Sequence, residues 1–150
     1  MYEIRHRFNG SIIVSGDAES LRELLLSALG GETSLQYADL KAINLRGEDL
    51  SGVCFGHCDF RAADLSNTDL SGTIFESAYI AGANLSGVKA RLANFRHANC
   101  RGCDMRGAKF IEADCRCGVF RGVDDTGCDW TSALLLGADF SGSKSGGMRA

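Results

Sequence analysis

Apolar residues recur at every fifth position of this chain without a slip, and this period constrains the fold more than any other feature. Of the 22 positions in register from Leu35 to Phe140, 18 hold Leu, Ile, Phe, Met or Trp. A period of five matches neither the ~3.6-residue turn of an α-helix nor the ~2-residue alternation of a flat strand. The backbone must therefore change direction within each repeat.

A second column of small or β-branched residues lies two positions before each apolar centre. Ala38, Val53 and Ala63 are typical, and Glu48 is the one clear exception. Polar residues and glycines fill the other positions, which suits turns that face the solvent. Short extended pieces joined by turns of one sense close into coils, and coils stack at the ~4.8 Å spacing of β-strands. Both columns are then expected to line the inside.

Several repeats, such as Ala63-Asp64-Leu65 and Ala138-Asp139-Phe140, resemble the A-(D/N)-L-x-x motif of the pentapeptide-repeat family. The resemblance covers residues 33–142. It implies an all-β solenoid, a right-handed quadrilateral β-helix of about 22 repeats with four repeats in each coil. On that geometry residues twenty apart stack, and Asp125 points inward. Because a buried carboxylate is costly unless it is paired, we expect the coil near Asp124 and Asp125 to be irregular.

The two ends of the chain differ from the repeats. Residues 1–32 are expected to form a β-hairpin and a capping helix, residues 33–142 the β-helix, and residues 143–150 a flexible tail. Asn9-Gly10 predicts the hairpin turn. The helix is expected to be capped by Asp17 or Ser20 and to stop at Gly30-Gly31. One apolar face is expected to be buried: Leu21, Leu24, Leu25, Ala28 and Leu29. Such a cap protects the open end of a stack of coils.

The seven cysteines, the lack of an apolar leader and the lack of an apolar run near ~20 residues predict a cytoplasmic protein with reduced thiols and no membrane contact. Two groups have spacings that invite a metal interpretation: Cys54 with His57 and Cys58, and Cys100 with Cys103. The repeat places most thiols inside and only Cys54 and Cys117 outside. We therefore expect no metal, no cofactor and, without a catalytic motif, no enzymatic activity.

The net charge of -3 does not indicate a class of binding partner. Charge is, however, unevenly distributed along the repeats. Acidic residues dominate the first and last repeats, and basic residues dominate the middle. The candidate acidic binding face consists of Asp49, Asp64, Asp69, Asp104, Asp124 and Asp129. The candidate basic band consists of Arg96, Arg101, Arg106, Arg116 and Arg121. Arg101 and Arg121 have no obvious counter-ion in the adjacent sequence.

The family resemblance implies DNA mimicry, because quinolone-resistance pentapeptide proteins resemble duplex DNA and occupy gyrase. Duplex DNA carries one negative charge per ~1.7 Å, whereas the repeats hold 14 acidic and 11 basic residues, so only local mimicry is expected. We expect a non-catalytic protein, bacterial or phage-encoded, that blocks or modulates a nucleic-acid-handling protein such as a topoisomerase or a CRISPR-type defence complex. The expected partner is a DNA-binding protein, without direct nucleic-acid contact. The alternative is a general interaction scaffold that uses the arginines.

The last repeats are unusually apolar. Trp130, Leu134 and Leu136 are candidates either for a cap over the last coil or for a contact with a second molecule. Some pentapeptide-repeat proteins pair through their C-terminal coils, so the resemblance implies a homodimer as one of the two outcomes.

Overall fold

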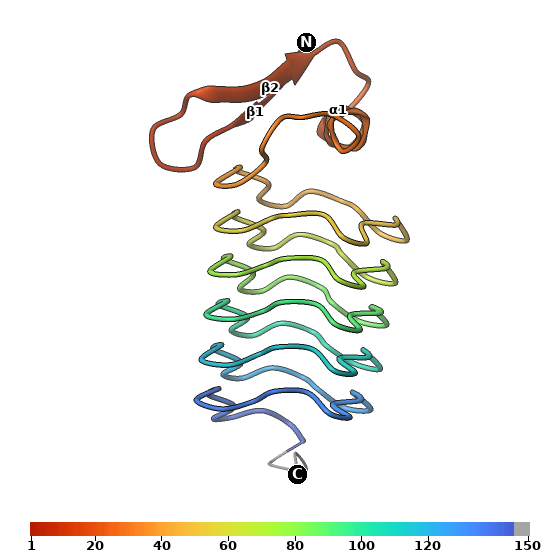
Figure 1. The fold of residues 1–150 in the computed structure, drawn as a ribbon, viewed down its shortest axis with the longest axis vertical. Coiled ribbons are helices and arrows are strands. Elements are labelled where there is room, and N and C mark those ends of the chain that lie inside the picture. The colour runs from red at the N-terminus through yellow and green to blue at the C-terminus, as the bar shows by residue number, and fades with distance from the viewer. Residues whose placement is uncertain (146–150) are drawn as a thin grey trace.

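The computed structural model describes residues 1–145, which form a stack of coils with a hairpin and one helix at its N-terminal end (Figure 1). Strands β1 (Tyr2–Arg5) and β2 (Ile12–Gly16) pair antiparallel as the hairpin, and helix α1 (Leu21–Ala28) follows. After the helix the chain alternates short turns with single bridging residues. The molecule is therefore a rod, and its candidate binding residues lie on the outer surface of the coils.

Parallel β-bridges join residues twenty apart along the stack, beginning with Asp39 and Asp59. In one rung the amide of Leu40 donates to the carbonyl of Asp59 at 2.8 Å, and the amide of Asp59 donates to the carbonyl of Ala38 at 2.9 Å. Four repeats therefore complete one coil, as the family resemblance implied. The chain contains no proline, and each proline would remove one of these donors.

The bridging residues define four faces of the rod, which follow one another around each coil. The first face carries Cys54, Ile74, Asn94, Asp114 and Leu134. The second face carries Asp39, Asp59, Tyr79, Asn99, Val119 and Asp139. The third face carries Asn44, Asp64, Asn84, Asp104 and Asp124. The fourth face carries Asp49, Asp69, Lys89, Lys109 and Asp129. Two turn residues form the corner between one face and the next.

Aromatic rings stack through the interior of the rod. The ring centroids of Phe55 and Phe75 are 5.7 Å apart, and those of Phe75 and Phe95 are 5.0 Å apart. All three side chains are fully buried. Burial of one such side chain stabilises the fold by about 1.5–3 kcal/mol. The stacked interior therefore makes the rod a rigid support for its surface residues.

Outward Asp and Asn side chains fix the turns that follow them. Oδ1 of Asp49 accepts a hydrogen bond from the amide of Ser51 at 3.0 Å, and further repeats show the same contact. The second turn residue adopts a positive φ, which at Gly87 is 66°. A Cβ at that position would lie 2.3 Å from Oδ1 of Asn67, so glycine leaves room for the Asn67 side chain at this corner.

The hairpin joins the rod by extending its backbone pairing. The amide of Asp39 donates to the carbonyl of Arg5 at 2.8 Å, and the amide of Arg7 donates to the carbonyl of Tyr37 at 2.8 Å. β1 therefore covers the upper backbone edge of the second face. β2 pairs only with β1 and lies farther from the coils (Figure 1).

Helix α1 lies beside the hairpin and packs its leucines inward. The hydroxyl of Ser20, rather than Asp17, caps the helix by accepting a hydrogen bond from the amide of Glu23 at 3.1 Å. Leu24 and Leu25 are buried. Arg22 forms an ion pair with Glu48 of the first coil. This contact explains why an acidic residue interrupts the small inward column at that position.

The expected irregularity at Asp124 and Asp125 is wrong. Asp104 bridges to Asp124 as in every other coil, and the side chain of Asp125 is buried inside it. The coil also continues past Gly142, because the amide of Lys144 donates to the carbonyl of Val123 at 3.1 Å. Residues 143–145 of the predicted tail thus belong to the rod, and residues 146–150 lie outside the described residues.

Candidate binding faces of the rod

The six candidate aspartates lie on two adjacent faces. The third face holds Asp64, Asp104 and Asp124, and the fourth holds Asp49, Asp69 and Asp129. On the fourth face Lys89 and Lys109 lie between Asp69 and Asp129, because each bridges directly to the next residue of the series. The structure thus brings Asp49 beside Asp69 and Asp104 beside Asp124. Within residues 1–145 the six do not form one continuous acidic face.

Several of these carboxylates are already engaged by the protein. Asp104 pairs with Arg106 at 2.6 Å, and this hydrogen bond lowers the pKa of Asp104. Hydrogen bonds from Thr126 and from Lys144, at 3.1 Å, lower the pKa of Asp124 to about 2. Hydrogen bonds from the residue two positions later also lower the pKa values of Asp49, Asp64 and Asp129. These groups are ionised at neutral pH, but part of their charge is compensated within the chain.

Three of the five candidate arginines have acidic partners. Arg106 pairs with Asp104, and Arg116 pairs with Asp114 at 2.6 Å. Nε of Arg121 lies 3.7 Å from the carboxylate of Asp139, so Arg121 has an acidic partner outside the adjacent sequence. That carboxylate comes from the next coil, where adjacent sequence gives no hint of it.

Arg96 and Arg101 form no ion pair with any residue from 1 to 145. Both lie in the same coil, at the two corners that flank the second face. Nε of Arg96 is buried and has no hydrogen-bond partner in the described part of the chain. The side chain of Arg101 is exposed. The two positive charges therefore border one face without a direct ion pair, although they lie close enough to Asp114 and Asp139 to lower the pKa values of these carboxyl groups.

The middle of the second face carries no acidic residue. Tyr79, Asn99 and Val119 occupy three successive bridging positions, in the stretch where Arg96 and Arg101 flank the face. Acidic residues resume at Asp59 on one side and Asp139 on the other. Three neighbouring strands span about 10 Å between the outer two at the usual strand spacing. Asp59 is buried and paired with Arg61, so only the Asp139 end exposes a carboxylate. The result is a short basic patch, made of Tyr79, Arg96, Asn99, Arg101, Val119 and Arg121.

The hairpin loop reaches the N-terminal side of this basic patch. The guanidinium carbon of Arg7 lies 4.0 Å from the ring centroid of Tyr79 and 4.7 Å from that of Phe8. Nη1 of Arg7 also donates to the carbonyl of His57 at 2.9 Å. Sequence reasoning missed these residues, because no local pattern relates the hairpin to a repeat some seventy positions later.

Aromatic stacking also ties the hairpin to the first coils. The rings of Tyr37 and His57 stack with centroids 4.5 Å apart and planes at 5°, and His6 stacks on the other side of Tyr37 at 5.2 Å. His57 is therefore half-buried, whereas His97, two coils later, is exposed. The position of the hairpin against the second face is thus fixed by several contacts.

A family model for pentapeptide repeats matches residues 32–67, 54–95 and 91–124, with eight copies of the repeat. The chain belongs to the pentapeptide-repeat family. Proteins of this family form right-handed quadrilateral β-helices, and the bridges between residues twenty apart agree with that architecture. They are generally structural or binding proteins rather than enzymes. No curated protein sequence matches this one.

Three solved structures illustrate the range of similar proteins. The pentapeptide-repeat protein Rfr23 from the cyanobacterium Cyanothece 51142 is 21% identical, with a TM-score of 0.73 over 79% of this chain and 95% of that one. HetL from Nostoc sp. Strain PCC 7120, involved in heterocyst differentiation regulation, is 16% identical, with a TM-score of 0.40 over 84% and 97%. QnrB1, a plasmid-mediated fluoroquinolone resistance protein, is 25% identical, with a TM-score of 0.25 over 69% and 70%. The first of these supports the fold.

The last described coil of this pentapeptide-repeat rod exposes apolar side chains. Leu134 is 50% exposed and Leu136 is 81% exposed, whereas Trp130 is half-buried against Phe110 and Phe140. Leu134 and Leu136 therefore point outward, and Trp130 contributes to the interior. Homodimerisation through this end stays a prediction.

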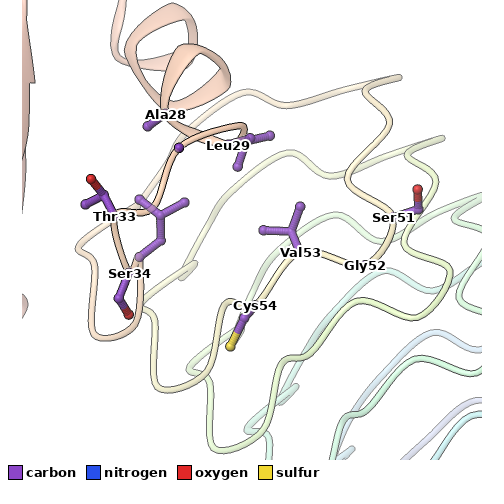
Figure 2. A pocket seen from close by; sticks show the side chains of 10 residues that line it. Ala28, Leu29, Thr33, Ser34, Ser51, Gly52, Val53 and Cys54 are labelled. Atoms are coloured by element: carbon purple, nitrogen blue, oxygen red, sulfur yellow. The ribbon is translucent and has the colours of Figure 1, made fainter.

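Residues 1–145 give little support for a metal site or a substrate-binding site. No three His, Cys, Asp or Glu side chains in residues 1–145 lie close enough together to hold a metal ion. The thiol of Cys58 donates to the carbonyl of Leu35 inside the rod, whereas Cys54 is exposed. A cavity of about 320 Å³ opens between the end of α1 and the first coil, beside Cys54 and Val53 (Figure 2), and no charged side chain lines it. No helix in these residues is long and apolar enough to cross a membrane.

Proposed function

We propose that this pentapeptide-repeat protein is a non-catalytic binding protein that presents the basic patch of its second face to an acidic segment of a partner protein. The supporting observation is that Arg96 and Arg101 flank a stretch of the face that holds Tyr79, Asn99 and Val119 and no carboxylate. Charge-assisted hydrogen bonds to carboxylates are strong, and planar guanidinium groups suit them. A partner carboxylate is the natural complement of these two arginines.

The size of the basic patch favours a short acidic peptide segment over nucleic acid. Duplex DNA presents one negative charge per ~1.7 Å without interruption. A polyanion longer than the patch would meet the exposed carboxylate of Asp139 at one end. The net charge of -3 adds a general repulsion. A protein segment with a few carboxylates is short enough to avoid Asp139.

The geometry favours this scaffold function over DNA mimicry by the acidic residues. Lys89 and Lys109 interrupt the acidic series of the fourth face, and Arg106 and Lys144 pair with carboxylates of the third. A mimic of duplex DNA needs negative charge at regular intervals along the rod. Inhibition of a topoisomerase or a defence complex remains a prediction for which this basic patch, rather than the aspartates, would supply the contact.

A binding assay with matched variants tests the proposal. The probe is a fluorescently labelled ten-residue peptide in which glycine and serine flank three consecutive glutamates, and its anisotropy reports binding. Replacing both Arg96 and Arg101 by Gln is expected to weaken binding roughly tenfold or more, because two charge-assisted contacts are lost. The matched control replaces Arg91 and Arg106 of the same coil by Gln, since these arginines already pair with Glu112 and Asp104.

The outcomes separate the proposal from its alternatives. Equal losses in the test and control variants would show that only overall charge matters, and would overturn the proposal. Tighter binding of a labelled 20-base-pair DNA duplex than of the glutamate peptide would assign the patch to nucleic acid instead. Stronger binding at low salt, confined to the proteins that keep Arg96 and Arg101, is the expected result.

A further inference from the structure

An exposed aromatic pair continues the basic patch toward the hairpin. Phe8 is 70% exposed and Tyr79 is 42% exposed, and the guanidinium of Arg7 lies over both rings. Single exposed apolar residues are common on protein surfaces. This pair differs because Arg7 is fixed by the carbonyl of His57 and because the Phe8 ring also lies 6.1 Å from that of Tyr37.

The aromatic pair and the arginines lie within one short stretch of the rod. Tyr79 bridges directly to Asn99, which belongs to the coil that carries Arg96 and Arg101. One strand spacing of ~4.8 Å therefore separates the level of Tyr79 from that of Arg101, and a second separates Arg101 from Arg121. An extended peptide rises ~3.3 Å per residue, so two or three residues cover this distance.

Arg7 makes the aromatic end part of the same electropositive strip. Its guanidinium forms no ion pair within residues 1–145 and is held by aromatic faces and a backbone carbonyl. A cation held in this way can still attract an approaching carboxylate. The apolar surface of Phe8 therefore borders positive charge on the side that faces the basic patch.

We infer that Phe8 and Tyr79 form a subsite for one large apolar side chain of the partner segment, placed within about three residues of the carboxylates that bind Arg96 and Arg101. This inference rests on the proposed function and adds a requirement to it. The partner segment carries an aromatic or large aliphatic residue beside a short acidic run, and it lies along the rod axis. Burial of the apolar side chain against Phe8 supplies affinity, and the arginines supply orientation.

Two probes of equal length test this subsite. One is the labelled peptide with three glutamates, and the other has phenylalanine in place of the neutral residue next to this acidic run. The two probes carry the same charge, and the wild-type protein is expected to bind the phenylalanine probe roughly tenfold more tightly. The Phe8→Ser variant is expected to lose this difference. The Ile12→Ser variant changes another exposed apolar residue of the hairpin and is expected to keep it.

The outcomes distinguish an error in the apolar subsite from an error in the proposed function. Equal binding of both probes, with binding still dependent on Arg96 and Arg101, would overturn the apolar subsite and leave the proposed function standing. If neither probe binds, the proposed function and the apolar subsite are both wrong. If Phe8→Ser weakens both probes by the same factor, Phe8 acts by holding the hairpin in place, and the subsite is wrong. Circular dichroism melting of the variants checks that the rod itself remains folded.

Discussion

Asp125 is buried within the last coils and accepts two hydrogen bonds from Ser145, twenty residues later. The amide of Ser145 lies 2.9 Å from Oδ1, and its hydroxyl lies 2.5 Å from Oδ2. These contacts provide the hydrogen bonds that a carboxylate needs when it leaves water. The column of interior residues that begins with leucines thus ends in a polar pair, and the coil keeps its regular shape.

Replacing Ser145 by Ala is expected to lower the free energy of unfolding by about 1–3 kcal/mol, because a buried carboxylate loses a hydroxyl donor. Urea denaturation monitored by circular dichroism measures the change. Ser141→Ala is the matched control, since its hydroxyl serves the exposed Asp139. An equal and small effect of both substitutions would contradict a stabilising role for the buried pair.

The coiled path of the backbone was predictable from the sequence because every five-residue repeat must bury its apolar residue in the same way. An inward column every five residues forces the same turn each time, so one geometry accounts for most of the chain. The prediction of an irregular coil at Asp125 was wrong because the residue that donates hydrogen bonds to its carboxylate, Ser145, lies in a segment whose composition resembles a flexible tail. A pattern of apolar residues does not report a polar partner inside the rod.

The binding surface was only partly predictable, because it depends on which charges remain unpaired. The sequence identified Arg96 and Arg101 among its candidates but could not show that Arg121 meets Asp139. It also gave no sign that Arg7 lies over Tyr79. Such contacts depend on the placement of the hairpin, and a local repeat says nothing about that placement.

The contact of Arg7 with Tyr79 is expected to hold the hairpin against the second face. The Arg7→Ala substitution removes two aromatic contacts and the hydrogen bond to the carbonyl of His57. It is expected to destabilise hairpin docking by about 1–3 kcal/mol, and faster amide hydrogen exchange in residues 2–16 would report this loss. Arg46→Ala, which removes an exposed arginine of the first coil, is the control. Unchanged exchange in Arg7→Ala would mean that backbone pairing alone fixes the hairpin.

Acid is expected to destabilise the rod in a defined pH range. The folded-state pKa of Asp124 is lowered to about 2, whereas an unfolded aspartate titrates near ~3.9. Between these values the folded state binds fewer protons than the unfolded state, so stability present above about pH 4 is lost as the pH falls toward 2. Thermal melts across this range measure the loss. It is expected to be smaller in Asp124→Asn than in the wild type.

A control carboxyl separates this effect from general charge repulsion. Glu19→Gln removes one negative charge from an exposed residue before α1 and is expected to leave the acid transition almost unchanged. Should Asp124→Asn and Glu19→Gln show the same acid dependence, the hydrogen bonds from Thr126 and Lys144 contribute nothing specific to the low-pH transition.

The cysteines are expected to fall into two reactive classes. Cys54 and Cys117 are exposed, whereas burial raises the pKa of Cys58 to about 12 and raises that of Cys115 as well. A thiol reacts through its thiolate, so buried thiols with raised pKa values react slowly. Mass spectrometry after brief maleimide treatment is expected to find label on Cys54 and Cys117 first. Rapid labelling of Cys58 in the native protein would contradict the interior position of its side chain.

The apolar end of the rod gives the prediction of homodimerisation a direct test. If two copies meet through the last coil, Leu136→Asp is expected to convert dimer to monomer, because a charge replaces an apolar side chain in the contact. Sedimentation velocity across a range of protein concentrations measures the oligomeric state. Leu92→Asp is the matched control, since Leu92 is an exposed leucine that lies more than two coils before Leu136. A wild-type protein that stays monomeric at the highest concentration, or a Leu136→Asp variant that stays dimeric, would exclude pairing through this end.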